Sequence, residues 1–445
     1  MRDENTLYWI WLSEKCGAAS KQFGRLIDKY DDPFEIYGLS GDEIEQLDGI
    51  NTSLKAKLCE KDLEHSYSIL KYCKENRVDV ISYSDMRYPA RLKNIEDAPI
   101  LLYCLGRFPD FNSSLCIGIV GTRKMSEYGK QSSYKIAYEL ASAGAVVVSG
   151  MALGVDGTAA CGALAAGGLT VAVLGCGIAT AYPKEHKRLM EEIAKKGAVI
   201  TEYPPNESPR AHNFPKRNRI ISGLCQGVLV VEGSQSSGAM ITARRAIDQG
   251  REVFALPGKI DESNSGGPNE LIREGAYAAL CSDDILAHYH FLYGDVIDLG
   301  KHTKAKKKCA AADADAALKR YGVSSKELPK YSDRRGRTSV DKEFPIETND
   351  TFETPIKKED ATEKNEKIEK IEESKNTLAD NSAEVLDSLD AETRKVFEVL
   401  PIDKAISPDA LSALGIDIGA AITALTMLEL CGLVSSLPGG LYVRK

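Results

Sequence analysis

Short apolar segments alternate with helix-length segments between residues 113 and 286, and this alternation constrains the fold more than any other feature of the chain. The apolar segments are β-branched or continuously apolar, which is typical of strands that are covered on both faces. Each intervening segment is long enough for a right-handed crossover helix, so successive strands can lie parallel in one sheet. We therefore predict an α/β fold with an extended Rossmann-like, doubly wound sheet. Its expected strands are residues 116–120, 145–149, 170–174, 198–201, 227–231 and 252–255.

The residues that follow these strands are rich in glycine. Ligands of doubly wound sheets bind beyond the carboxyl ends of the strands. Glycine lets backbone amides approach an anion, and the helix that follows adds the positive end of its dipole. The pattern predicts a phosphate-binding crevice. The glycine-rich ends are residues 121–129, 150–157, 175–177 and 232–238.

The usual nucleotide-binding motifs are missing from these loops. Residues 121–123 read Gly-Thr-Arg and not G-x-G-x-x-G, and Arg123 would crowd a pyrophosphate lying on the backbone. The chain has no G-x-x-x-x-G-K-[ST] sequence, so a Walker-type ATP site is unsupported. We expect no cofactor.

A basic segment at residues 213–219 is the strongest candidate binding element. Arginine binds phosphate oxygens bidentately, and asparagine can hydrogen-bond a base edge or a sugar. The net charge of -8 argues against a wholly basic coat protein, so a nucleic-acid surface must be a local patch. The alternative is a solvated basic turn. The candidate residues are Lys216, Arg217, Asn218 and Arg219.

Several short motifs of the α/β region, taken in order, resemble those of the DNA processing protein A family (DprA, or Smf). The resemblance implies a bacterial cytoplasmic protein that binds single-stranded DNA, forms a homodimer and helps to place the RecA recombinase on the strand. In naturally transformable cells such a protein acts on incoming DNA. The matching motifs are residues 85–103, 121–129, 149–157, 162–164, 172–177, 182–183, 213–221, 237–243, 257–258 and 269–272.

The resemblance also implies a DNA pocket on this chain. Arg123 and the basic segment match its positive residues, and the backbone of Gly121 and Thr122 is expected to supply amide donors. Lys184 is expected to extend the phosphate track. The rim would be formed by Ser237, Gly238 and Thr242, and Tyr182 and Phe214 are the candidates for base stacking.

One position departs from the family pattern. After Gly157 the family often has His and then Arg, whereas this chain has Thr158, Ala159, Ala160 and Cys161. Any contribution of that position to the pocket or to ion binding would be absent here.

The sequence favours binding over catalysis. Asp156 and Glu232 end two strands and could form a carboxylate pair for acid–base chemistry. We instead expect Asp156 to cap a helix and Glu232 to pair with an arginine. The competing class is a nucleoside-monophosphate phosphoribohydrolase, whose P-G-G-x-G-T-x-x-E motif supplies a catalytic glutamate. Residues 232–242 lack that glutamate, so we expect no enzyme activity and no catalytic residue.

The histidines and cysteines add little chemistry. His212 beside the basic segment could stack on a base or simply face solvent. Eleven cysteines stand singly without a C-x-x-C pair, which favours a reducing cytoplasm over a disulfide framework or a zinc site. No signal peptide and no run of about 20 apolar residues is present.

The flanking regions predict three further parts. Residues 1–76 read as a helical domain like a SAM or helix-hairpin-helix domain, in which the turn 47–50 either holds a phosphate or only packs. The α/β domain would span 77–290, and the charged residues 291–385 a flexible linker. Residues 386–445 predict a winged helix of three helices and a hairpin. Its third helix, 417–430, has no Lys or Arg, so we favour protein interaction or self-contact over DNA binding.

Overall fold

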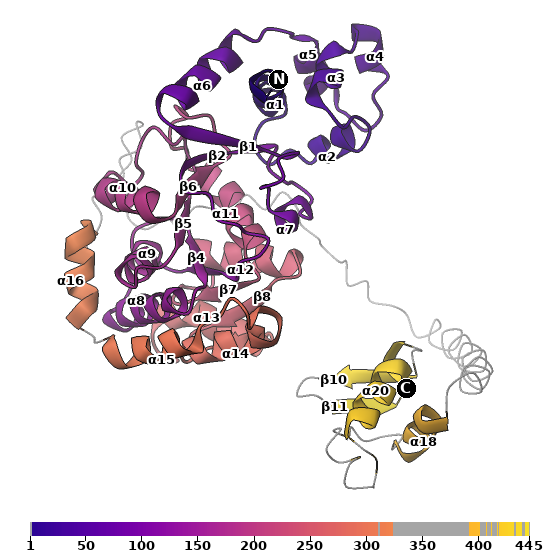
Figure 1. Ribbon diagram of the computed structural model, residues 1–445, viewed down its shortest axis with the longest axis vertical. Coiled ribbons are helices and arrows are strands. Elements are labelled where there is room, and N and C mark those ends of the chain that lie inside the picture. The colour runs from indigo at the N-terminus through magenta and orange to yellow at the C-terminus, as the bar shows by residue number, and fades with distance from the viewer. Residues whose placement is uncertain are drawn as a thin grey trace, which may run out of the picture. The chain divides into compact units, whose positions relative to one another are not determined.

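The computed structural model of the chain describes residues 2–309, 312–323, 391–400, 406, 411, 416, 418–430, 433–437 and 441–444. The chain divides into two compact units, Met1–Pro345 and Ile346–Lys445. Figure 1 shows the helices and strands of both units. Within the described residues, no helix has the length and apolar character needed to cross a membrane.

A nine-stranded sheet organises the described part of the first unit, in the order β1-β2-β6-β5-β4-β3-β7-β8-β9. The strands from β6 to β9 are parallel, and β1 and β2 continue the sheet antiparallel at one edge. All six predicted strands are present, with ends within one residue of those expected. The strands are β1 (Val78–Ser82), β2 (Leu101–Gly106), β3 (Cys116–Val120), β4 (Val146–Ser149), β5 (Thr170–Val173), β6 (Ala198–Thr201), β7 (Gly227–Val230), β8 (Glu252–Ala255) and β9 (Tyr277–Ala278).

Helices cover both faces of this sheet, as its continuously apolar strands predict. Alternate residues of β3 point to opposite faces: Ile117 and Ile119 pack against α8, α9 and α14, whereas Cys116 and Val120 lie in the cluster that contains α11 and α12. The helices of this domain are α7 (Ala90–Lys93), α8 (Glu127–Ser142), α9 (Val155–Ala165), α10 (Lys187–Lys196), α11 (Asn213–Leu224), α12 (Gly238–Asp248), α13 (Gly266–Arg273) and α14 (Ser282–Tyr293), with short 3-10 helices η1 (Lys184–His186) and η2 (Ser263–Ser265).

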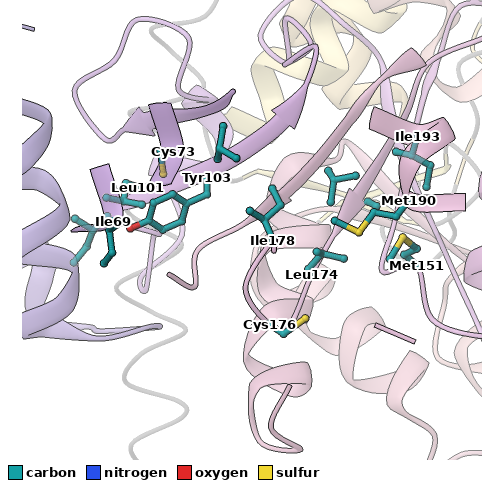
Figure 2. Close-up of a cluster of buried hydrophobic side chains, with 14 of the residues drawn as sticks. Ile69, Cys73, Leu101, Tyr103, Met151, Leu174, Cys176, Ile178, Met190 and Ile193 are labelled. Atoms are coloured by element: carbon teal, nitrogen blue, oxygen red, sulfur yellow. The ribbon is translucent and has the colours of Figure 1, made fainter. Parts of the chain in front are cut away.

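The N-terminal region is helical, as predicted, and shares a core with the sheet. Trp11 donates a hydrogen bond from Nε1 to the Glu60 carbonyl oxygen at 3.1 Å, which joins the first and fifth helices. Figure 2 shows Ile69 and Cys73 beside Tyr103 of β2, in the cluster that continues to Leu174 of the neighbouring β5–β6 region. The helices are α1 (Arg2–Cys16), α2 (Gln22–Ile27), α3 (Pro33–Gly38), α4 (Gly41–Glu45), α5 (Thr52–Cys59) and α6 (Glu64–Glu75).

The turn between α4 and α5 is already occupied by a side chain of the protein. Gly49 has φ 70°, and Nη1 of Arg25 donates to its carbonyl oxygen at 2.7 Å. A Cβ atom at Gly49 would lie 2.1 Å from that nitrogen. This arrangement supports the packing interpretation of the turn over a phosphate-binding one.

Two helices lie in the segment predicted as a linker. Helix α15 (Leu299–Lys308) packs on α8 and α14, where His302 Nε2 lies 2.8 Å from the Ser282 hydroxyl oxygen. Helix α16 (Ala312–Tyr321) packs on α8, α9 and α10. The prediction of a linker from residue 291 is therefore wrong for these helices, because their apolar faces are buried. The rest of the predicted linker, 324–385, lies outside the described residues.

The described residues of the second unit comprise α18 (Ala391–Val399), α20 (Ile418–Leu430) and a hairpin of β10 (Val434–Leu437) and β11 (Leu441–Arg444). Val396, Leu425 and Leu428 are buried in its core. The predicted third helix and the hairpin are confirmed. The predicted second helix covers residues 406–414. Of these, Ile406 instead forms an isolated β-bridge with Tyr442, Leu411 is helical, and the others lie outside the described residues.

Candidate nucleic-acid interface

A pocket opens at the carboxyl ends of β3 and β4, which is the sheet edge that the glycine-rich loops predicted. Its cavity of about 40 Å³ has room for roughly three water molecules. Loops and the first turn of α11 form its walls. The lining residues are Arg123, Gly150, Ala152, Leu153, Tyr182, Pro183, Phe214 and Arg217.

Arg217 of α11 supplies the buried charge of the pocket. Its exposed fraction is 4%, and Nη1 donates to the carbonyl oxygens of Gly150, at 2.8 Å, and Val173, at the ends of β4 and β5. Its Nε–H is buried without a partner in the described part of the chain. Burial lowers the pKa of Arg217, an effect that the nearby Asp156 opposes. The guanidinium is thus held rigidly and keeps a donor that an anion could satisfy.

The β4–α9 loop has a backbone shape that requires its glycines. Gly154 has φ 79°, and a Cβ there would lie 2.3 Å from the Thr122 carbonyl oxygen. A Cβ at Gly150 would lie 2.3 Å from Nη1 of Arg217. The glycines therefore let two loops and a guanidinium approach one another closely.

Asp156 holds this loop but does not cap a helix as predicted. Its Oδ2 accepts the Gly150 N–H at 3.0 Å, and the N-cap residue of α9 is Gly154. Burial raises the pKa of Asp156, against the opposing effect of Arg217. Asp156 does not cap the helix because it lies inside the first turn of α9, from where it reaches back to the preceding loop.

His186 supports the same loop from outside the pocket. Its Nδ1 lies 3.0 Å from the Met151 carbonyl oxygen and must donate, since a carbonyl only accepts. Met151 has φ 55°, which is unusual for a residue with a side chain. A Cβ at Gly157 would lie 2.5 Å from the imidazole ring. His186 is the last residue of η1 and the N-cap residue of α10.

Two aromatic rings form one wall of the pocket. Tyr182 and Phe214 have ring centroids 5.1 Å apart, and the guanidinium carbon of Arg217 lies 6.0 Å from the Phe214 centroid. Both rings are partly exposed. The structure therefore brings the two predicted stacking candidates together with the buried arginine.

Of the three predicted cations Arg123, Lys184 and Lys216, only Arg123 lines the pocket, and the other two follow or precede lining residues in the sequence. Arg123 is exposed and lines the pocket, Lys184 directly follows the lining residue Pro183, and Lys216 is exposed next to Arg217. The predicted amide donors before Arg123 are less available. Thr122 donates its N–H to the Glu232 carbonyl oxygen at 2.7 Å, so the proposed amide of Thr122 already has a partner.

Arg219, also predicted as a DNA contact, does not line the pocket, and its guanidinium is held by carboxylates within the fold. Its exposed fraction is 1%; Nη2 pairs with Glu202, and Nε lies 3.4 Å from a carboxylate oxygen of Asp97. Residues two apart on a helix point about 200° apart, so Arg217 and Arg219 face different sides of α11. Arg219 is a structural ion-pair residue.

The remaining predicted residues gather at the start of α12 and not in the pocket. Nδ2 of Asn218 donates to the Gly238 carbonyl oxygen at 3.3 Å, and the Thr242 hydroxyl donates to the same oxygen at 3.5 Å. Ser237 is the N-cap residue of α12. The prediction placed these residues at the pocket rim; the contacts show a helix–helix junction.

Glu232 has a different partner from the predicted arginine. Its carboxylate accepts the Ser126 N–H at 2.9 Å and the Ser126 hydroxyl, and Ser126 in turn caps α8 through the Gly129 N–H at 3.1 Å. Glu232 therefore fixes the β3–α8 loop that carries Arg123.

Sequence reasoning missed Ala152, Leu153 and Pro183 as lining residues, because apolar loop residues carry no chemical signal. The departure at Ala160 and Cys161 lies inside α9, where both side chains are buried against the core.

The family model of DNA recombination-mediator protein A matches residues 79–290. DNA processing protein DprA of Bacillus subtilis (strain 168) is 39% identical over 236 residues, which are 52% of this chain and 80% of that protein. The chain belongs to the DprA/Smf family.

Two further matches agree with this assignment. DNA processing protein DprA of Streptococcus pneumoniae (strain ATCC BAA-255 / R6) is 43% identical over 210 residues, 47% of this chain and 74% of that protein. An X-ray structure of DprA from S. pneumoniae has 36% sequence identity and a TM-score of 0.55, covering 63% of this chain and 97% of that one. The DprA winged helix domain model matches residues 380–440, so the second unit of this DprA/Smf protein contains the predicted winged helix.

Proposed function

We propose that this chain binds single-stranded DNA, with backbone phosphates lying against Arg123, Arg217, Lys184 and Lys216. The observation that carries the proposal is the buried guanidinium of Arg217, whose Nε–H lacks a partner in the described structure and which lies with the exposed Arg123 in one pocket. As part of the same proposal, the protein helps to load RecA onto the strand, acts as a homodimer in the cytoplasm and performs no chemistry of its own.

The form of the pocket supports a phosphate backbone as ligand. Arg217 is fixed by carbonyl oxygens of two strand ends, so it pays little conformational entropy when a phosphate binds. Tyr182 and Phe214 offer ring faces beside the charge. Stacking on aromatic rings accepts any base, but it requires a base that is free of a duplex. The combination favours a single strand and little sequence preference.

The relatives support the choice of DNA over other phosphate ligands. The B. subtilis and S. pneumoniae relatives are named DNA processing proteins, and the family model is that of a DNA recombination mediator. The match to the S. pneumoniae structure covers 97% of that chain. We extend these roles to this chain as part of the proposal.

Equilibrium binding tests the proposal. A fluorescent single strand of about 20 nucleotides and its duplex are titrated with the wild type, Arg123→Ala and Lys216→Ala over a salt series. We expect tighter binding of the single strand, and a loss of roughly 0.7 in the slope of log affinity against log salt for each phosphate contact removed. Lys57→Ala, an exposed lysine of α5, is the matched control.

Two results would contradict the proposal. Either the wild type ignores single strands, or both pocket variants bind with the wild-type affinity and slope. The basic residues would then be a solvated surface, and a small nucleotide would be the next ligand to test.

A further inference from the structure

Helix α16 follows the end of the family match at residue 290, yet it is firmly docked on the α/β domain. Ala317, Leu318 and Tyr321 are buried in the same cluster as Leu189 and Ile193 of α10. At its other end, Nζ of the buried Lys130 lies 2.7 Å from both Asp315 and Glu127. The helix therefore has a defined place beside α8, α9 and α10 (Figure 1).

The last turn of α16 brings two cations to the start of α10. Lys319 and Arg320 are exposed, and Gly322 follows them with φ 74°. A Cβ at Gly322 would lie 3.5 Å from Cβ and 3.6 Å from Cδ of Arg188, so the end of α16 touches the stem of that arginine. Glu192 lies close to both arginines: its pKa is lowered first by a hydrogen bond from Lys195 and further by Arg188 and Arg320.

The start of α10 is in turn continuous with the pocket. Pro183 lines the pocket, and the next residues include the exposed cations Lys184, Lys187 and Arg188. The rise from residue 184 to residue 188 is about 8 Å for one turn of 3-10 helix leading into α-helix. That length corresponds to two or three phosphates of a stacked strand at roughly 3.4 Å each.

The surface formed by the start of α10 and the end of α16 also carries acidic residues, but its net charge stays positive. Glu185 and Glu191 are exposed on the same stretch, and Glu192 is hydrogen-bonded to Lys195 at 2.7 Å. The two exposed carboxylates stand against five exposed cations. These cations are Lys184, Lys187, Arg188, Lys319 and Arg320.

We infer that a single strand bound at the pocket continues along the start of α10 and reaches the end of α16, with its phosphates against Lys187, Arg188, Lys319 and Arg320. The inference rests on the proposed function, since it needs a strand at the pocket. The occupant is that same strand, because the surface starts at a pocket residue and carries the charge that complements phosphate. Helix α16 thereby lengthens the DNA site beyond the domain that the family model covers.

DNA strands of two lengths distinguish binding at the pocket from binding at the end of α16. The double variant K319A/R320A changes two exposed side chains and keeps good helix formers, so its thermal stability should match the wild type. For a strand of about 20 nucleotides, we expect its salt slope to fall by roughly 1.4, that is 0.7 for each lost contact. For a strand of about four nucleotides, which we expect to bind at the pocket without reaching the end of α16, we expect wild-type affinity and slope.

The control is K304A/K307A, which removes two exposed lysines from the neighbouring helix α15. It changes the net charge equally and should leave both strands at wild-type affinity. Arg123→Ala should weaken binding of both strands.

Each contrary result points to a different failure. If K319A/R320A binds the long strand like the wild type, the extended site is wrong, while the Arg123→Ala result still decides the proposed function. If both double variants weaken the long strand equally, net charge alone explains the effect and the extended site is overturned. If the wild type binds neither strand, the proposed function fails and the extended site fails with it.

Discussion

Helix α11 has two arginines that are almost equally buried but lie in opposite environments. Arg217 meets two backbone carbonyls at the strand ends and, in the described residues, forms no ion pair within 4 Å. Arg219, on another face, meets the carboxylates of Glu202 and Asp97. Neutral carbonyls orient the Arg217 guanidinium and the nearby Asp156 offsets its charge only in part, whereas two carboxylates contact Arg219 directly. The counter-charge, and not the burial, therefore separates a binding arginine from a structural one.

Removing the Arg219 ion pair should have the largest effect on the free energy of unfolding. Arg219→Ala leaves Glu202 buried without its partner, and removing one member of a buried pair costs about 3–5 kcal/mol of unfolding free energy. Urea denaturation followed by circular dichroism measures the loss. Lys216→Ala on the same helix should stay within about 0.5 kcal/mol of the wild type, because that side chain is exposed. A loss below about 1 kcal/mol for Arg219→Ala would show that the pair contributes little.

Removing a charge from the pocket face should alter binding and spare the fold. Arg123→Ala should cost about 1.5–3 kcal/mol of binding free energy, the usual contribution of a hydrogen bond to a charged group, or roughly 10- to 150-fold in affinity for a single strand. Its midpoint of urea denaturation should be unchanged, since Arg123 is exposed. A variant that instead loses stability and keeps its affinity would reverse the distinction between the two faces.

Filling the space under Arg217 tests how rigidly the pocket arginine is held. Gly150→Ala places a Cβ 2.3 Å from Nη1 and must displace the guanidinium or the loop. Overpacking of this kind costs about 1–3 kcal/mol of stability. Single-strand affinity should fall as well, because Arg217 no longer lies against the strand-end carbonyls. Gly24→Ala in α2 meets open space and is the matched control; equal effects of the two substitutions would refute the close fit.

The smallest expected effect is a difference in how acidification changes the stability that His186 and Glu202 contribute. His186 supports the pocket loop, and Glu202 pairs with Arg219. Burial lowers the pKa of His186, which supports the pocket loop, so its contribution to stability is complete above the unfolded value of 6.5 and is lost as the pH falls toward the folded pKa. Burial raises the pKa of Glu202 on the ion-pair face despite Arg219, so acid does not remove stability through that group in the same range. Thermal midpoints at pH 7.5 and 5.5 compare the wild type with His186→Gln.

We expect His186→Gln, whose amide can still donate to Met151, to lose less stability on acidification than the wild type. The exposed His212→Gln serves as the control. An identical acid response of the wild type and His186→Gln would remove His186 as the cause.

The strands, the glycine loops and the place of the site could be predicted from the sequence because each is a local pattern. The continuously apolar run at residues 116–120 identified β3, and the glycine-rich run after β4 predicted a loop that comes close to other groups. Arg123 and Arg217, a residue of the 213–219 segment, both line the pocket at this sheet edge, as the family resemblance implied.

The partners of charged residues could not be predicted in the same way. Glu232 was expected to pair with arginine, but it accepts from Ser126, 106 residues away. Lys130 and Asp315 are separated by 185 residues, and that contact helps to place α16 where a linker was expected. The local sequence does not indicate which distant side chain will pack beside a given residue.

The sheet, the order of its helices and the edge at which glycine-rich loops gather could be predicted from the chain, since they follow from periodicity and from the loops that end each strand. Which cations remain available depends on tertiary packing. Arg217 and Arg219 are equivalent in a basic segment of the sequence, but the packing of α11 against the sheet turns one toward backbone carbonyls and the other toward two carboxylates. The electrostatic role of each arginine is set by those neighbours, which come together only when the chain has folded.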